Sequence, residues 1–228
     1  MIKPSPAGDE EFPRPILTVD VAIFTLVEGR LMVALFRREQ GPFAGRESLP
    51  GGYVHAEEDR DARDTVSRVL ATKAGLKSVY VEQLRTFAGR NRDPRGWSAS
   101  IAYIALLPKE QLERSSQGVI LRPAEAPGDL PFDHNEIVAV ARERLRTKGA
   151  YSTLPARLLP DSFTLPEMQK VYETVVGEKL DQSSFRRKIA ELGVVEPLPG
   201  ETRQSSTVRR PAQLYRLVDP ISLFDRKL

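Results

Sequence analysis

The chain has 228 residues, of which 40% are hydrophobic and 29% are charged, a composition typical of a soluble globular protein. It contains no Cys and only two His, which excludes a disulfide framework, a zinc finger, a thiol nucleophile and an imidazole-rich metal site. The N-terminal sequence lacks the apolar stretch of a signal peptide, and no apolar run is long enough to span a bilayer, so we expect a cytoplasmic protein. The formal net charge of +3 is too small to predict nucleic-acid binding by itself.

The first part of the chain alternates predicted strands with predicted helices. After a flexible N-terminal lead at 1–15, the runs 16–27 and 31–36 are rich in β-branched and aromatic residues and flank a Glu-Gly pair, which predicts a β-hairpin. Then come a Gly-rich loop, a helix, two strands, a loop-like stretch and a second helix, expected at 41–52, 61–74, 79–87, 98–107, 117–131 and 134–148. This alternation indicates a sheet covered by helices.

A predicted linker at 149–160 separates this part from a different pattern. Two short helices and a final hairpin follow, expected at 165–176, 182–192, 194–198 and 212–218. Two helices followed by a hairpin is the order of a winged helix. We therefore place the domain boundary near residue 150, with a sheet-containing domain at 16–150 and a winged helix, a fold that binds DNA, at 151–228.

Basic residues gather in this last part of the chain. Between residues 182 and 218, seven Lys and Arg residues stand against three Glu, so this segment has a larger net positive charge than the whole chain. Helix 182–192 is expected to turn Phe185, Ile189 and Leu192 to the core and its polar face to the major groove of DNA. The predicted DNA-binding residues are Gln182, Ser183, Ser184, Arg186, Arg187, Lys188, Arg209 and Arg210. A solvated basic surface, or a helical protein-interaction module, is the alternative interpretation.

Residues 49–76 resemble the Nudix box, although its two ends lie two residues further apart than in the template. The framework of the box is matched by Leu49, Pro50, Gly51, Gly52, Glu58, Arg68, Leu70, Gly75 and Leu76. The three helical glutamates of the box fall instead on Val69, Thr72 and Lys73. These positions share one helix face, which in a Nudix hydrolase presents carboxylates to Mg²⁺. We therefore expect no catalytic residues, no metal site and no enzyme activity.

Carboxylates at the start of the same helix offer an alternative set of metal ligands. They are Glu57, Glu58, Asp59, Asp61 and Asp64. Acids at this end of a helix also interact favourably with its dipole, and we expect this structural role because Mg²⁺ demands both ligand number and geometry. A Nudix pyrophosphatase with relocated metal ligands is the enzyme alternative.

Several stretches, taken together and in order, resemble the Nudix-related transcriptional regulator (NrtR) family. They are LPGGYV at 49–54, RNRDPRGWSASIAYIAL at 90–106, PFDHNEI at 131–137, LLPDSFTLPEMQKVYETVVG at 158–177, LDQSSFRRKIAELGVV at 180–195 and RRPAQLYRL at 209–217. The resemblance implies an α/β (α+β) Nudix fold, with a mixed sheet sandwiched by helices, followed by a winged helix-turn-helix domain. It also implies a homodimeric repressor of NAD biosynthesis genes that binds an inverted-repeat operator. ADP-ribose or a related NAD metabolite would be its effector, with no cofactor; a sugar-sensing regulator of the same architecture is the alternative.

The ligand is expected to contact two loops beside the box. One of two consecutive arginines at the end of strand 31–36 should turn inward to a phosphate, and the Arg-rich loop 90–97 offers guanidinium groups for a diphosphate. The predicted ligand-binding residues are Arg37, Arg38, Gly52, Arg90, Asp93, Arg95 and Trp97. Phe43 and Tyr53 are further candidates for stacking on adenine, and His134 is expected to make a structural contact. A solvated connector is the alternative interpretation of the Arg-rich loop.

Overall fold

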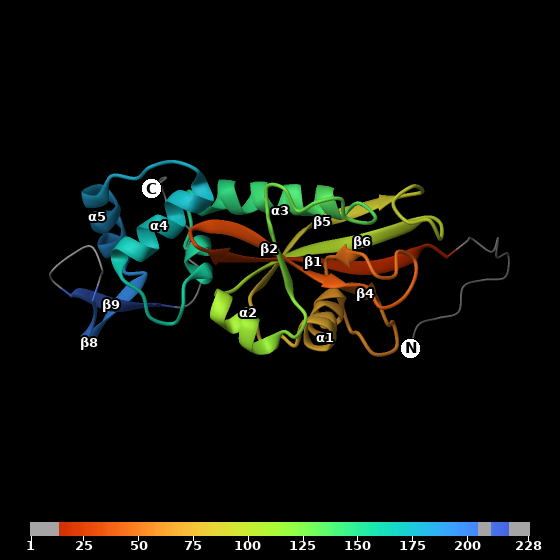
Figure 1. Ribbon diagram of the computed structural model, residues 1–228, viewed down its shortest axis with the longest axis horizontal. Helices are drawn as coiled ribbons and strands as arrows, with labels where there is room; N and C mark the ends of the chain where they lie inside the picture. Colours follow the sequence, from red (N-terminus) through yellow and green to blue (C-terminus); the bar gives the residue numbers. More distant parts are fainter. Residues whose placement is uncertain (1–13, 205–210, 219–228) are drawn as a thin grey trace, which may run out of the picture.

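The computed structural model describes residues 14–204 and 211–218. A sheet lies between helices along most of the length of the molecule, and two helices with a small hairpin form its other end (Figure 1). Most of the predicted flexible lead, residues 1–13, falls outside the described residues. The predicted DNA contacts Arg209 and Arg210 fall outside them too.

The large sheet is built around its first strand. Its seven strands are β1 (Ile16–Val27), β2 (Arg30–Arg37), β3 (Glu47–Ser48), β4 (Gly51–Tyr53), β5 (Val81–Gly89), β6 (Ser98–Leu106) and β7 (Ile120–Pro123). β1 pairs antiparallel with β2 and β4 on one side and parallel with β6 on the other. The sheet is therefore mixed, as predicted, and β1 and β2 form the predicted hairpin.

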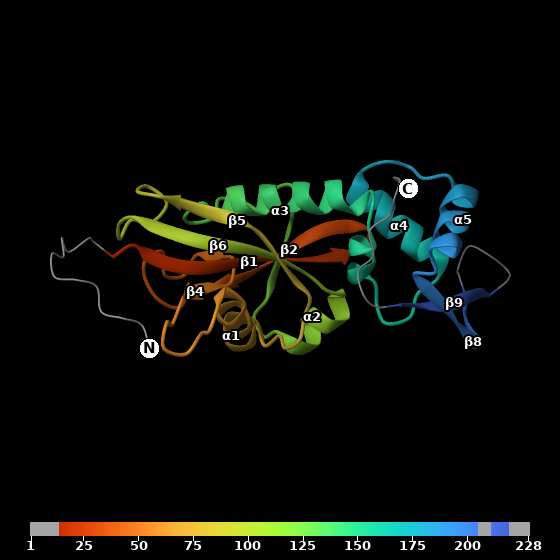
Figure 2. The same ribbon diagram turned by 180° about the vertical axis from the view of Figure 1, so that it is seen from behind.

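Helices cover both faces of this sheet (Figures 1 and 2). They are α1 (Ala62–Ala74), α2 (Lys109–Ser115) and α3 (His134–Gly149). Odd residues of β1 such as Val21 and Ile23 pack in the core beneath α1 and α2, whereas Ala22 and Phe24 pack in the core beneath α3. Asp20 shares the α3 side, so a carboxylate enters the sheet directly below the start of that helix.

Four elements of this part were not predicted: the short strands β3 and β4, which overlap the expected Gly-rich loop 41–52, and β7 and α2. Residues 117–131 were expected to be loop-like, but β7 lies within them and pairs with β2. β7 has only four residues and ends in a proline, so it shows no alternation that a sequence pattern could detect. α2 also has a weak pattern, because Leu112 is its only buried residue.

The C-terminal part contains the helices and the hairpin expected of a winged helix. Its elements are η1 (Leu154–Leu158), α4 (Leu165–Val176), α5 (Gln182–Leu192), β8 (Val195–Arg203) and β9 (Ala212–Leu217). Thr164 and Glu167 form a capping box at the start of α4, and the side chain of Asp181 accepts from Ser184 N–H at the start of α5. α4 and α5 each end at a glycine in the left-handed conformation.

The segment that joins the two parts is packed rather than exposed. Residues 149–160 were predicted to be a linker, yet they contain the 3₁₀ helix η1, in which Leu154 is fully buried. A Cβ on Gly149 would lie 2.9 Å from Pro155 and 3.0 Å from Val175, so only glycine allows α3 to approach η1 and α4 this closely. The two parts therefore share one hydrophobic core. None of the helices described has the length and hydropathy needed to cross a membrane.

Candidate functional site

The glycine loop, residues 49–52, leads into β4 and from there towards α1 at the centre of the Nudix-like box. A Cβ on Gly51 would lie 2.0 Å from Asp20 Oδ1, and a Cβ on Gly52 would lie 2.9 Å from Val69 Cγ2. Neither position has room for a side chain, because the loop backbone rests on β1 and on α1. Gly52, predicted to contact the ligand, is thus required for packing on α1.

The face of α1 that follows the glycine loop carries the three residues aligned with the glutamates of the box. Val69 is 1% exposed and belongs to the core between α1 and the sheet. The hydroxyl of Thr72 donates to the carbonyl of Arg68 at 2.8 Å. The ammonium of Lys73 donates to the carbonyl of Gly51. This face therefore presents a methyl surface, an engaged hydroxyl and a cation, and no carboxylate.

The acids at the start of α1 are engaged in local structure. Asp59 accepts from Arg68 Nε at 3.0 Å and from the Thr65 hydroxyl at 2.8 Å, and its hydrogen bond to Arg68 is the main reason that its pKa is lowered. Asp61 caps the helix, and Asp64 pairs with Arg60 at 2.7 Å.

The relocated acids therefore have the expected structural role. No group of three acidic or His side chains in the described part of the chain is arranged to hold a metal. The donor set thus does not fit the Mg²⁺ ion that a Nudix hydrolase uses.

Three cations surround the glycine loop. Arg38 donates from Nε to the carbonyl of Pro42 at 2.8 Å, and its guanidinium lies 4.9 Å from the ring centroid of Phe132. Arg38 is also close enough to Lys73 and to Arg95 for their charges to interact. Desolvation, followed by the neighbouring Arg95, lowers the pKa of Arg38. A site that gathers like charges in this way favours an anion.

The two consecutive arginines at the end of β2 point to different places. Arg38 is the inward one, as the alternation of the strand requires. Arg37 is exposed and donates to the carbonyl of Gly45 at 2.8 Å. Arg37 also lines a separate cavity of about 480 Å³ together with Arg122. The structure therefore brings Arg38, but not Arg37, to the glycine loop.

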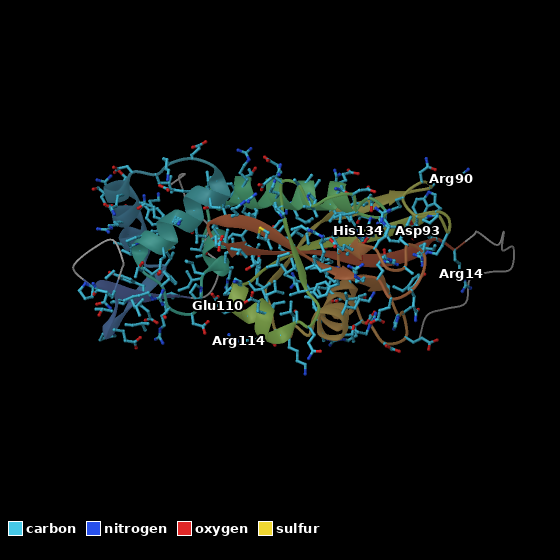
Figure 3. The ribbon with its side chains drawn as sticks, viewed as in Figure 1. Arg14, Arg90, Asp93, Glu110, Arg114 and His134 are labelled. Atoms are coloured by element: carbon cyan, nitrogen blue, oxygen red, sulfur yellow. The ribbon has the colours of Figure 1, made fainter. Side chains whose placement is uncertain are left out.

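In the Arg-rich loop between β5 and β6, some arginines are held by carboxylates and others are exposed. Arg92, whose side chain is 7% exposed, holds both carboxylate oxygens of Asp133 at 2.9 and 2.8 Å. Asp93 is buried and accepts from the backbone N–H and from Nε of Arg95, both at 2.9 Å. Arg90 lies at the outer rim, whereas Asp93 lies nearer the body of the molecule (Figure 3). Asp93 thus orients Arg95, and Arg92 anchors the loop.

Two aromatic side chains of the predicted site are exposed, and one of them, Tyr53, contacts Arg95 of the cation group. Tyr53 is 48% exposed and Trp97 is 49% exposed. The guanidinium of Arg95 lies 5.2 Å from the ring centroid of Tyr53 and donates to its hydroxyl. Phe43 instead packs edge-on against Phe132, with 5.0 Å between ring centroids. Tyr53 and Trp97 are therefore the aromatic rings free to stack on a base, and their contact with a ligand stays a prediction.

His134 fastens the glycine loop to α3. Its Nδ1 accepts from Leu49 N–H at 3.1 Å, and its Nε2 lies 3.4 Å from Asp20 Oδ1. Asp20 also accepts from the Ser100 hydroxyl at 2.6 Å. Burial raises the pKa of Asp20, but His134, Ser100 and Arg92 outweigh it and lower the pKa below its usual value. His134 makes the structural contact that was predicted. Asp20 was not predicted, although an acid inside an otherwise apolar strand was a visible signal.

α3 connects this network to the C-terminal part. Beyond the far end of the helix, Ser152 O accepts from the hydroxyl of Tyr172 at 2.9 Å. Tyr172 is fully buried in α4 and packs edge-on against Phe185 of α5, with 5.5 Å between ring centroids. Leu49, α3, Tyr172 and Phe185 therefore form one contiguous series of contacts from the glycine loop to α5.

The apolar and the polar side chains of α5 lie on opposite sides of the helix. Phe185 and Ile189 are buried and Leu192 is partly buried, as predicted. The side facing away from the core carries the predicted DNA contacts, which are exposed except for the half-buried Lys188: Gln182, Ser183, Ser184, Arg186, Arg187 and Lys188. Within residues 14–204 and 211–218, no carboxylate lies within ion-pair distance of Arg186 or Lys188, and Arg187 is 3.9 Å from Glu191. These charges are available to a polyanion.

The basic residues of the small hairpin are engaged differently. Arg203 holds both carboxylate oxygens of Glu167 at 2.9 and 3.0 Å and donates to Ser162 O. Arg216 pairs with Glu196 across the strands. These two arginines of the basic segment stabilise the C-terminal part, so the free positive charge among the described residues concentrates on α5.

The fold defines a two-domain protein, in which a sheet covered by helices carries a group of cations and is joined to a winged helix. The family model of the NrtR DNA-binding winged helix domain matches residues 155–217. The chain is 40% identical over 213 residues to the ADPR responsive transcriptional repressor NtrR of Acinetobacter baylyi, a match that covers 90% of this chain and 83% of the relative.

Two solved structures are similar to this chain. Shewanella oneidensis NrtR complexed with a 27mer DNA has a TM-score of 0.83 and 35% identity, covering 93% of this chain and 99% of that one. The Nudix domain of the same protein complexed with ADP ribose has a TM-score of 0.54 and 36% identity, covering 61% and 94%. The chain therefore belongs to the NrtR family, with a Nudix fold followed by a winged helix.

Proposed function

We propose that this protein is an ADP-ribose-responsive transcriptional repressor of genes for NAD biosynthesis and salvage. The observation that supports this most strongly is the 40% identity to a repressor that responds to ADPR, over a match that includes both domains. The ADP ribose complex of the Shewanella oneidensis domain supports the same ligand. The repressor acts in the cytoplasm as a homodimer, and its two α5 helices bind the half-sites of an inverted repeat.

The Nudix domain of this repressor binds its ligand without hydrolysing it, and no cofactor takes part. Val69, Thr72 and Lys73 offer no carboxylate at the positions that hold the metal in a hydrolase. A metal ion supplies charge stabilisation and an activated water in such hydrolysis, and this donor set retains neither. The domain is therefore a sensor rather than an enzyme.

The ligand pocket lies around the glycine loop. We assign Arg38 and Arg95 to the diphosphate, because their two positive charges lie close enough to interact and guanidinium groups bind phosphate oxygens well. Trp97 and Tyr53 are the stacking partners for the adenine base. The exposed Arg37 and Arg90 have a lesser, electrostatic role at the rim.

Ligand binding reaches the DNA through α3. The start of α3 is bonded to both parts of this site: His134 accepts from Leu49 of the glycine loop, and Asp133 pairs with Arg92 of the Arg-rich loop. A diphosphate that draws Arg95 and the glycine loop together therefore also moves the start of α3. The other end of α3 packs on α4, which supports α5 through Tyr172. A small tilt of α3 therefore changes the distance between the two α5 helices of a dimer, and half-site spacing is a strict geometric requirement.

Fluorescence anisotropy of a labelled operator duplex, selected by the protein from a random-sequence library, tests this proposal. We expect saturating ADP-ribose to weaken operator binding about 5–150-fold, the usual range of allosteric coupling. ADP, ribose 5-phosphate and free sugars should have much smaller effects. A parallel incubation with ADP-ribose and Mg²⁺ or Mn²⁺ should release no AMP. Release by a sugar alone, or turnover on the order of 1 s⁻¹, would contradict the proposal.

A further inference from the structure

One cation lies on the face of α1 that binds the metal in a Nudix hydrolase, and it is not among the predicted ligand-binding residues. Lys73 lies in the last turn of α1, and its ammonium donates to the carbonyl of Gly51. We propose that Lys73 takes the place of the divalent metal of a Nudix hydrolase and, with Arg38, binds the diphosphate of the nucleotide ligand directly, so that binding needs no Mg²⁺. This inference rests on the proposed function. It adds a ligand-binding residue to the site and states that binding does not depend on a metal.

The position of Lys73 gives it free hydrogen-bonding capacity beside the loop. An ammonium has three donors, and the bond to Gly51 uses one of them. The bond from Arg38 to Pro42 uses Nε and leaves the two terminal nitrogens of the guanidinium. Across the described ranges, no carboxylate comes within 4.0 Å of either cation, unlike Arg68, Arg92 and Arg95, which all have one. Lys73 and Arg38 are thus the unneutralised charges of the pocket.

The two charges also destabilise each other in the absence of an anion. Partial desolvation, followed by the nearby Arg38, lowers the pKa of Lys73. Asp20 and Glu39 act in the opposite direction but do not reverse the shift. An anion between the two cations would relieve their repulsion, whereas a divalent cation would add to it. The same pair that repels Mg²⁺ therefore attracts a phosphate.

A diphosphate diester matches this site in charge. It carries one negative charge on each phosphate, and Lys73 with Arg38 supplies one positive charge for each. The ammonium of Lys73 is held beside the glycine loop by the carbonyl of Gly51, and this contact leaves its other donors for a phosphate. A Lys neutralises the diphosphate but does not polarise a water molecule as a metal does, which explains how a pocket can bind this ligand and leave it intact.

The test is calorimetric titration of the full-length protein with ADP-ribose and, separately, with inorganic pyrophosphate, each in Mg²⁺ and in EDTA. We expect wild-type affinities in the two buffers to agree within about twofold. Lys73→Gln should weaken both ligands by about 10–100-fold, the range for one charge-assisted hydrogen bond, and Mg²⁺ should not restore binding. Lys73→Arg should keep most of the affinity. Lys77→Gln is the matched control, an exposed Lys just beyond the same helix, and should bind like wild type.

Unchanged operator binding and an unchanged unfolding midpoint of Lys73→Gln would show that the variant is folded. Wild-type binding that requires Mg²⁺, or a Lys73→Gln variant with wild-type affinity for both ligands, would overturn the inference. If the wild type binds neither ADP-ribose nor pyrophosphate, the inference is overturned too. If pyrophosphate binds through Lys73 while ADP-ribose does not bind, the inference stands and the proposed effector is wrong.

Discussion

The Nudix domain and α5 of the winged helix both use arginine and lysine, but they hold these residues in different ways. In the Nudix domain, Arg92 and Arg95 are fixed by Asp133 and Asp93 before any ligand arrives. On α5, Arg186 and Arg187 extend from an exposed helix face with little to restrain them. Preorganised cations suit the recognition of one small anion, because their ordering entropy is lost on folding rather than on binding. Exposed cations without a close acidic partner suit a long polyanion, where counterion release drives binding.

The largest effect should come from the preorganised group. Arg92→Ala removes the cation that pairs with the partly buried carboxylate of Asp133 and lies beside the buried Asp20, so we expect the free energy of unfolding to fall by about 3–5 kcal/mol. Arg90→Ala changes an exposed arginine of the same loop and should cost less than about 0.5 kcal/mol. Urea denaturation of the two variants measures the contrast, and equal midpoints would remove the distinction between the two arginines.

The next effect concerns the exposed cations of α5 and the predicted DNA contact Arg209. Arg186→Ala should weaken operator binding by about tenfold and reduce the log–log salt slope by about one unit, because one phosphate contact is lost. Arg187→Ala and Arg209→Ala should behave in the same way. Arg216→Ala, which removes a cation already paired with Glu196, should leave the slope unchanged. Anisotropy titrations at several salt concentrations give these slopes. A flatter slope for Arg216→Ala alone would show that DNA binds a surface other than the exposed face of α5.

A smaller effect is expected where the two regions meet. Tyr172→Phe removes the buried hydrogen bond to Ser152, which should lower the free energy of unfolding by about 1 kcal/mol and reduce the effect of ADP-ribose on operator affinity. Thr174→Val removes a more exposed bond between the same regions, to the carbonyl of Gly29, and should cost less. Thermal unfolding and anisotropy measure the two quantities. Full retention of the ligand effect in Tyr172→Phe would argue against the route through α3.

The smallest effect is a change in acid stability. The pKa of Asp20 is lowered in the folded protein, so its charge stabilises the fold above the unfolded pKa of about 4 and loses this contribution as the pH falls through the folded value. Asp20→Asn should therefore flatten the decline of unfolding free energy below about pH 4, when compared with wild type. Denaturation curves from about pH 6 to 3 test this dependence, and parallel declines would exclude Asp20 as a contributor.

The sequence predicted the elements that carry strong periodicity or caps. α5 could be placed because Phe185 and Ile189 recur at helical spacing between Asp181 and Gly193. β7 and η1 could not, because short segments containing proline have no period and form only through contacts with distant residues.

The sites divide in the same way. The loss of carboxylates at Val69, Thr72 and Lys73 was visible in the sequence, since position on a helix fixes the face. The separate roles of Arg92 and Arg95 were not, because their partners Asp133 and Asp93 become recognisable only once the loop is folded.

The most direct test of the central claim, that one chain couples a nucleotide pocket to DNA, is the reciprocity of the two binding events. We expect operator DNA to weaken ADP-ribose binding by the same factor by which ADP-ribose weakens operator binding, because the coupling free energy belongs to both ligands. Calorimetric titration of ADP-ribose into the full-length protein, with and without a saturating inverted-repeat operator duplex, measures this factor. The account predicts a difference of about 5–150-fold between the two titrations. Equal affinities would contradict it, even if ADP-ribose binds tightly.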